Sequence, residues 1–170
     1  RAEANREIND IRLKAEDREN QTAAERIVLL RKAQKIEEDI TAKEIEAKQL
    51  LVDAQIKETQ PKLVCFSVPF PGNLYSAFRC AQFIKSHYPK IKVAMGGGFP
   101  NTELRSVSDV RVFEFFDFIS LDDGELPIEL LYNAVLKNET TFKRTFILEN
   151  GVVVYKNNST KPDYKQQDVG

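Results

Sequence analysis

The stretch KVAMGGGFPNTE, residues 92–103, decides the fold of this chain. Its first four residues predict a short buried strand, and three glycines follow at once. Glycine has no Cβ, so a glycine run at the carboxyl end of a strand lets backbone and ligand approach closely. Ligands of open α/β sheets bind at that end of the strands. The triplet therefore predicts a ligand-binding strand exit, and the alternative is a flexible turn that binds nothing.

Composition divides the chain at residue 61. Residues 1–60 contain no glycine, proline or aromatic residue, whereas all seven glycines, all seven prolines and all sixteen Phe and Tyr residues lie in 61–170. We therefore expect a helical or coiled-coil extension at 1–60, an α/β domain at 61–140, and a β-hairpin with a linker at 141–170. The chain begins with Arg rather than Met, and we expect it to be a fragment.

Charge and cysteine content point away from several partners. The net charge of −1 indicates neither a nucleic-acid surface nor a membrane surface. The two cysteines form no paired motif, which fits a reduced cytoplasmic protein better than a disulfide framework. No apolar run is long enough to span a bilayer. We expect a cytoplasmic protein with neither nucleic acid nor membrane as its partner.

Residues 1–60 predict a long helix, because good helix formers fill the segment and its apolar positions step by three and four. The stripe changes phase near residues 20–22, where Thr22 and Glu25 form a candidate capping box that could start a second helix. The helix could be solvated along one edge of the body, or form a coiled coil with itself or a partner. Residues 12–58 resemble the helical repeats of phage tail tape-measure proteins, which implies a role in assembly.

Residues 61–170 alternate between strand and helix signals. We expect strands at 63–68, 92–95 and 117–121, and helices at 74–87, at 102–108 and around Pro127. This order predicts a parallel sheet with right-handed crossovers. Asn150-Gly151 between two apolar runs predicts a β-hairpin over 145–155. Three parallel strands make only a partial sheet, and its inner strands need cover on both faces. Either the long helix of residues 1–60 supplies this cover or the strands that belong before residue 63 are absent, and we expect the second.

The candidate site is the edge where three strand-exit loops meet, at residues 67–73, 96–101 and 122–125. These loops offer a hydroxyl, an amide, open glycine backbone, and the carboxylates of Asp122, Asp123 and Glu125. The set suits binding rather than catalysis, because no nucleophile–base pair accompanies it. We expect His87 to be a helix cap or surface group and Cys65 a buried small hydrophobe, and we do not predict a metal site.

The run LVCFSVPFPGNLYSAFRCAQFIKSHYPKIKVAMGGGFPNTELRSVSDVRVFEFFDFISLDDGELPIELL, residues 63–131, resembles the cobalamin-binding N-terminal domain of radical S-adenosylmethionine enzymes. The resemblance implies a flavodoxin-like (Rossmann-like) sheet that binds cobalamin at the carboxyl edge of its strands. It places Ser67 and Gly96–Gly97 in the pocket for the nucleotide tail, and Asp123-Gly124-Glu125 matches a further family feature. The cofactor-binding residues it implies are Ser67, Val68, Pro69, Asn73, Gly96, Gly97, Gly98, Asp123, Gly124 and Glu125.

The sequence departs from that family in three ways. The Asp-x-His-x-x-Gly element that supplies a histidine to cobalt is absent, and Pro69 stands where leucine is usual. The Cys-x-x-x-Cys-x-x-Cys motif is also absent, and without its thiolates no iron–sulfur cluster can form. In the family this motif would lie beyond Gly170.

The resemblance therefore implies the cobalamin-binding module of a radical enzyme, truncated before its iron–sulfur catalytic domain. We expect this chain alone to lack catalytic activity, because the cluster and S-adenosylmethionine belong to the missing part. The partners we expect are a corrinoid cofactor and a helix that binds residues 1–60. The alternative function is a helical interaction or assembly protein, like a phage tail coiled coil, with a passive α/β body.

Overall fold

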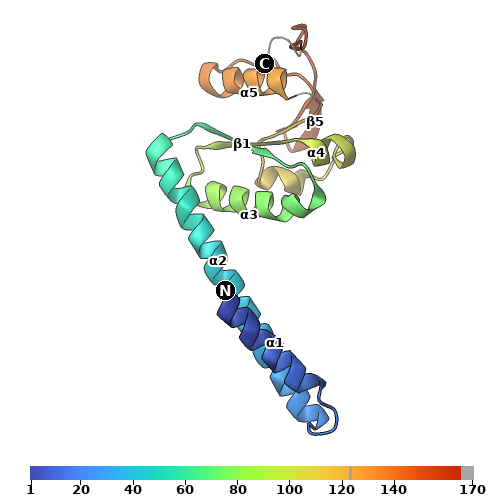
Figure 1. Cartoon of the computed structure of the whole chain (residues 1–170). Coiled ribbons are helices and arrows are strands. Elements are labelled where there is room, and N and C mark those ends of the chain that lie inside the picture. The colour runs from blue at the N-terminus through green and yellow to red at the C-terminus, as the bar shows by residue number, and fades with distance from the viewer. Residues whose placement is uncertain (123, 166–170) are drawn as a thin grey trace. The chain divides into compact units, whose positions relative to one another are not determined.

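The computed structural model describes residues 1–122 and 124–165. The chain forms two compact units, Arg1–Lys57 and the remainder from Glu58, and Figure 1 shows helices in the first and a sheet with helices in the second. Within the described residues, none of the helices combines the length and the apolar character needed to cross a membrane.

The first unit is a helical hairpin. Helix α1 spans Ala2–Glu16 and helix α2 spans Ala23–Thr59, so the predicted break near residues 20–22 is confirmed. The capping box is also confirmed, because the Thr22 N–H donates to the Glu25 carboxylate at 2.8 Å and the Glu25 N–H donates to Thr22 Oγ1 at 3.3 Å. These bonds satisfy backbone donors that the first turn of α2 would otherwise leave unpaired.

The two apolar seams of the hairpin pack against each other. Their shared core consists of Ile8, Ile11 and Ala33, with Leu29, Ile36 and Ile40 packed around it. Arg12 donates to both oxygens of Glu37, at 2.9 and 3.0 Å, and the Arg1–Glu44 pair at 3.0 Å shows that the helices run antiparallel. The partner of the first seam is therefore the second seam of the same chain.

The second unit contains one mixed sheet of five strands in the order β1-β2-β3-β4-β5. Strands β1 (Leu63–Ser67), β2 (Lys92–Gly96) and β3 (Phe118–Ser120) run parallel. Strands β4 (Thr145–Glu149) and β5 (Val152–Lys156) form an antiparallel hairpin beside β3. The expected α/β class with a partly parallel sheet is confirmed, and the hairpin is a continuation of the same sheet.

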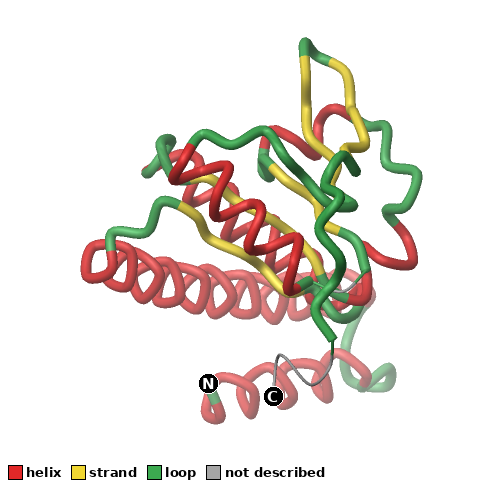
Figure 2. Tube along the Cα trace, turned by 90° about the horizontal axis from the view of Figure 1, so that it is seen from above, coloured by secondary structure: helices red, strands yellow, loops and turns green. Residues whose placement is uncertain are grey.

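The β4–β5 hairpin confirms the predicted turn. Asn150 and Gly151 both have positive φ, 52° and 78°, which is the conformation that a two-residue type I′ turn requires. Only Thr145 and Phe146 of β4 pair with β3, whereas all five residues of β4 pair with β5. The hairpin therefore extends beyond the parallel strands (Figure 2).

Helices cover both faces of the sheet. Helix α3 (Pro71–His87) lies on one face, and helix α5 (Glu125–Lys137) lies on the other (Figure 1). On the α3 face, Phe116 meets Phe66 and Phe78 edge to face, with ring centroids 6.3 and 5.1 Å apart. The cluster on the α5 face comprises Ala94, Leu131, Phe142 and Ile147. Parallel strands require this two-sided cover because both of their faces are apolar.

The expected helix over 102–108 is wrong. Helix α4 spans Gly98–Glu103, and a 3₁₀ helix, η1, follows at Val110–Glu114. Gly97 has φ 101°, which ends β2 abruptly and lets the helix begin at the next residue. Pro100 then falls in the first turn of α4, where its missing N–H costs no hydrogen bond. Helix α3 likewise begins earlier than expected, with Pro71 in its first turn.

A partly buried carboxylate fastens the amino ends of β2 and β3. Asp117 accepts hydrogen bonds from Lys85 Nζ, from Lys92 Nζ at 2.9 Å and from the Val93 N–H at 2.8 Å. Burial raises the pKa of the Asp117 carboxyl, but the hydrogen bonds from the two lysines and the backbone outweigh burial. The pKa of Asp117 in the folded protein therefore lies below its ordinary value.

We expect Asp117→Asn to lower the free energy of unfolding by about 1–3 kcal/mol near neutral pH. The neutral amide of asparagine loses the negative charge that binds both lysines in the wild type. A depressed folded-state pKa gives stability that is present above the unfolded pKa of about 3.9 and is lost as the pH falls through the folded value. Urea unfolding of both proteins at a series of pH values checks this. A stability difference that stays constant into strong acid would contradict it.

Candidate functional site

A cavity of about 390 Å³ lies where β1, β2 and β3 end beneath α5. It is lined by Cys65, Phe66, Ser67, Ala94, Met95, Gly96, Gly97, Ser120, Asp122, Gly124, Ile128 and Leu131. The three strand-exit loops that the sequence predicts to converge each contribute to this lining.

The floor of the cavity is a part of the sheet that carries only small side chains. Register pairs Cys65 with Ala94 and Ser67 with Gly96. Ser120 completes the row, since its Oγ lies 2.9 Å from where a Cβ on Gly96 would be. Among these floor residues, none has a side chain larger than that of cysteine. Phe118 pairs with Ala94 and so shares the face, but it packs against the α5-face cluster and does not line the cavity. The result is a slot between a flat floor and α5, a shape that suits a planar, largely apolar group.

Two hydroxyls are available to a ligand in this slot. Ser67 and Ser120 make no side-chain hydrogen bond within the described part of the chain, although Ser120 is only 7% exposed. Ser67 is exposed and both residues line the cavity, so water or a ligand there can satisfy the two hydroxyls. These two groups therefore provide polar atoms that could orient a ligand in an otherwise apolar slot.

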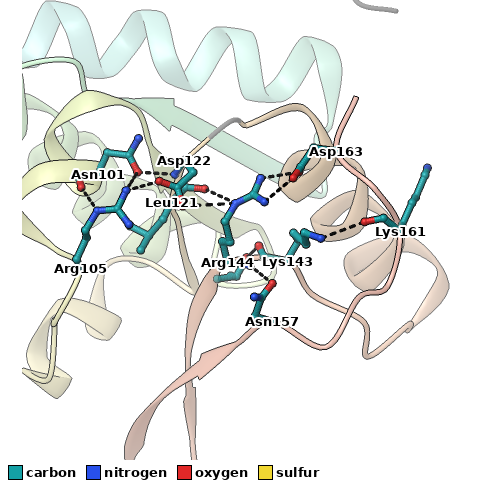
Figure 3. Close-up of polar contacts among 10 residues, drawn as sticks. Asn101, Arg105, Leu121, Asp122, Lys143, Arg144, Asn157, Lys161 and Asp163 are labelled. Atoms are coloured by element: carbon teal, nitrogen blue, oxygen red, sulfur yellow. Dashed lines mark hydrogen bonds and ion pairs between the residues drawn. The ribbon is translucent and has the colours of Figure 1, made fainter. Parts of the chain in front are cut away.

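Asp122 forms the third polar element of the cavity. Its carboxylate pairs with Arg105 and lies 3.6 Å from Arg144 Nε, and its N–H donates to Asn101 Oδ1 (Figure 3). Its φ of 59° lies in the left-handed region, which aspartate tolerates better than most residues. These contacts come from α4 and the residues just after it, and from the chain just before β4, so Asp122 connects both segments to the cavity.

The space beside the glycine run is filled by the protein's own backbone. A Cβ on Gly97 would lie 2.9 Å from the Val68 nitrogen, and one on Gly98 would lie 2.8 Å from the Pro69 oxygen. The Val68 N–H donates to the Gly96 oxygen at 2.8 Å, and the Val68 oxygen accepts from the Phe99 N–H at 2.9 Å. The glycines therefore hold the β1–α3 loop against the start of α4, a role that their sequence pattern alone did not indicate.

The structure brings together four of the ten cofactor-binding residues that the resemblance implies, in addition to Asp122. Ser67, Gly96, Gly97 and Gly124 line the cavity. The remaining predicted residues are placed as follows: Val68 is buried beneath the site, Pro69 and Gly98 form the loop contact, Asn73 is exposed on α3, and Glu125 is the exposed first residue of α5. Asp123 lies outside the described residues.

Several lining residues were missed by sequence reasoning. Cys65, expected to be buried, is exposed at the cavity because β1 is the edge strand of the sheet. The surrounding protein nevertheless raises the pKa of its thiol, so Cys65 stays protonated at neutral pH. Strand alternation from Ser67 was the signal that could have placed Cys65 on the cavity face. The presence of Ile128 and Leu131 at the cavity depends on how α5 packs against the sheet, which the sequence does not specify.

The expectation for His87 is confirmed. Its Nδ1 lies 3.0 Å from the Phe83 oxygen, and its exposed ring stacks on Phe83 at the end of α3. Among the described residues, no three His, Cys, Asp or Glu side chains gather closely enough to hold a metal ion.

No protein-family model matches the chain, and no curated protein sequence is significantly similar to it.

We expect Gly97→Ala to lower the free energy of unfolding by about 2–4 kcal/mol, since the variant combines a strained φ with a clash against Val68 backbone. Gly72→Ala is the matched control, because a Cβ there meets no atom within 4 Å. On a helix this control should be neutral or stabilising by up to about 1 kcal/mol. Urea titrations of the two variants test the difference, and equal midpoints would contradict the role assigned to Gly97.

Proposed function

We propose that the second unit is a corrinoid-binding module with a partial flavodoxin-like sheet, and that cobalamin is its cofactor. The observation that carries this proposal is the slot of small residues between the ends of three parallel strands and α5. A flat heteroaromatic group, such as the base of a nucleotide tail, suits a floor without projecting side chains. At about 390 Å³ the cavity could take such a group, while the macrocycle would remain outside.

The donor set of the cavity fits a neutral ring better than a phosphate. Ser67 and Ser120 can donate to or accept from ring nitrogens, and no Lys or Arg is found among the cavity-lining residues that the structure describes. The apolar groups of Ile128 and Leu131 would cover the opposite side of the ring. These features favour a corrinoid tail over a flavin or nucleotide bound through its phosphates.

In this proposal the residues of the chain bind and orient the cofactor. A bound corrinoid would supply cobalt-centred redox and group-transfer chemistry. The described residues bring no histidine to the cavity, since His87 belongs to the exposed end of α3. The proposal therefore assigns the cobalt no imidazole ligand from this part of the chain. We further propose that the parent enzyme belongs to the radical S-adenosylmethionine class, on the strength of the sequence resemblance.

A titration with hydroxocobalamin tests the proposal. The full chain should shift the visible spectrum of the corrinoid and retain it through gel filtration. Cys65→Phe should weaken binding by about tenfold or more, because a ring at this exposed floor position fills the slot without entering the core. Cys80→Ala is the control, because it changes the second cysteine of the chain, which lies on α3, and this variant should bind hydroxocobalamin like the wild type. No spectral shift with the wild-type chain at high micromolar concentration would refute the proposal.

A helical assembly role is the second candidate, and one observation favours it. The apolar stripe of α2 that packs against α1 continues through Ala47 to Ala54, past the residues that α1 covers. There Leu50 is 65% exposed and Leu51 is 61% exposed. We propose a second copy of the chain as the occupant of this stripe.

Sedimentation velocity of the full chain tests this second role. The wild-type chain should sediment as a dimer, and the double variant Leu50→Glu/Leu51→Glu as a monomer, because buried unpaired carboxylates oppose association. Leu13→Glu, at a position on α1 that is also 65% exposed, is the matched control and should leave the dimer intact. A monomeric wild type over the micromolar range would reject the assembly role.

A further inference from the structure

The segment after β5 folds back onto the second unit, and we call residues 157–164 the C-terminal strap. Asn158 Oδ1 accepts from the Phe142 N–H at 2.8 Å, and Asn158 Nδ2 donates to the Thr140 oxygen at 3.1 Å. The Ser159 N–H donates to the Phe142 oxygen at 3.0 Å. The strap is thus hydrogen-bonded along the residues that lead into β4.

The strap reaches α5 at the carboxylate of Glu129. Lys161 Nζ lies 2.8 and 2.6 Å from the two oxygens of Glu129, and the Tyr164 hydroxyl donates to the same carboxylate. The hydrogen bonds from Lys161 and Tyr164 hold the pKa of Glu129 below its ordinary value. Glu129 follows Ile128, which lines the cavity, so this contact fastens the α5 wall.

The strap is also held by Arg144, which binds the strap residue Asp163. Its guanidinium donates to both oxygens of Asp163, at 2.9 and 2.7 Å, and its side chain is only 13% exposed (Figure 3). The same side chain donates to the Leu121 oxygen at 3.4 Å and lies 3.6 Å from the carboxylate of Asp122. A bidentate arginine–carboxylate pair fixes the relative orientation of the two side chains as well as their distance. Arg144 therefore connects the strap to the cavity residue Asp122.

We propose that Arg144 is a positioning residue and that the strap, through Arg144 and Glu129, fixes the gap between α5 and the sheet. The two contacts fasten two parts of the cavity lining, the loop at Asp122 and the helix at Ile128. When both contacts are formed, the distance between α5 and the sheet is fixed before a ligand binds. A preformed slot binds more tightly because less ordering is left to the binding step.

Hydrogen exchange of the ligand-free full chain decides the proposal. The double variant Lys161→Met/Asp163→Asn should speed amide exchange about tenfold in α5 and in residues 121–122, because local opening becomes easier there. Exchange in α3, on the other face of the sheet, should not change. Glu149→Gln is the matched control, since it removes the Lys156–Glu149 pair at 2.7 Å in the distant hairpin. Unchanged exchange in α5 would overturn the proposal.

The salt dependence of ligand binding gives a second readout that a purely structural role would not move. This part rests on the proposed function, with hydroxocobalamin as the probe. Raising salt from about 50 mM to about 1 M should weaken wild-type binding about threefold, because salt screens the exposed ion pairs. The double variant should bind about threefold more weakly at low salt and show no further salt dependence. Equal affinity and equal salt dependence in both proteins would also overturn the proposal.

Conservative replacement at Arg144 separates charge from geometry. Arg144→Gln should behave like the double variant in exchange and binding. Arg144→Lys should recover part of both effects, because a lysine can pair with Asp163 but cannot also reach Leu121 in the same geometry. If the wild type binds no corrinoid while exchange in α5 responds as expected, the proposed function fails and the strap stands.

Discussion

The contact between Gly97 and Val68 is the constraint on which the second unit depends. Gly97 has a φ of 101° and no room for a Cβ. The backbone of Val68 bonds to Gly96, before Gly97, and to Phe99, after it. This contact brings the ends of β1 and β2 together and sets where α4 begins. The position of Asn101 and Arg105 then follows, and through them that of Asp122. The cavity is the space that this chain of contacts leaves beneath α5.

Small residues have two distinct roles along this edge. Gly97 and Gly98 are small because neighbouring backbone fills the space beside them. Cys65, Ser67 and Ala94 are small on a face that α5 covers only in part, and there the space stays open as the cavity. A run of glycines therefore indicates a close approach without indicating what approaches. In this chain the partner of the second and third glycines is the protein's own loop.

Local signals in the sequence predicted the elements well, and non-local contacts account for what was missed. The Asn150-Gly151 turn, the capping box at Thr22 and the three strand segments each depend on a few adjacent residues. The start of α4 was misplaced because the positive φ of Gly97 is imposed by Val68, almost thirty positions away in the chain. Cys65 was assigned to the core because nothing in its own strand says that β1 is an edge. The contact of Arg144 with Asp163 joins residues that no spacing rule relates.

The connections within the two units imply different folding rates. In the first unit, α1 and α2 are adjacent in sequence and joined by a short turn at residues 17–22, so their seams meet through local contacts. In the second unit, β1, β2 and β3 pair only after two crossovers that each contain helical segments. Loop closure must precede such pairing, which makes parallel sheets slow to form. The helical hairpin should thus form on a microsecond scale, while the cavity appears only once the slower sheet has closed.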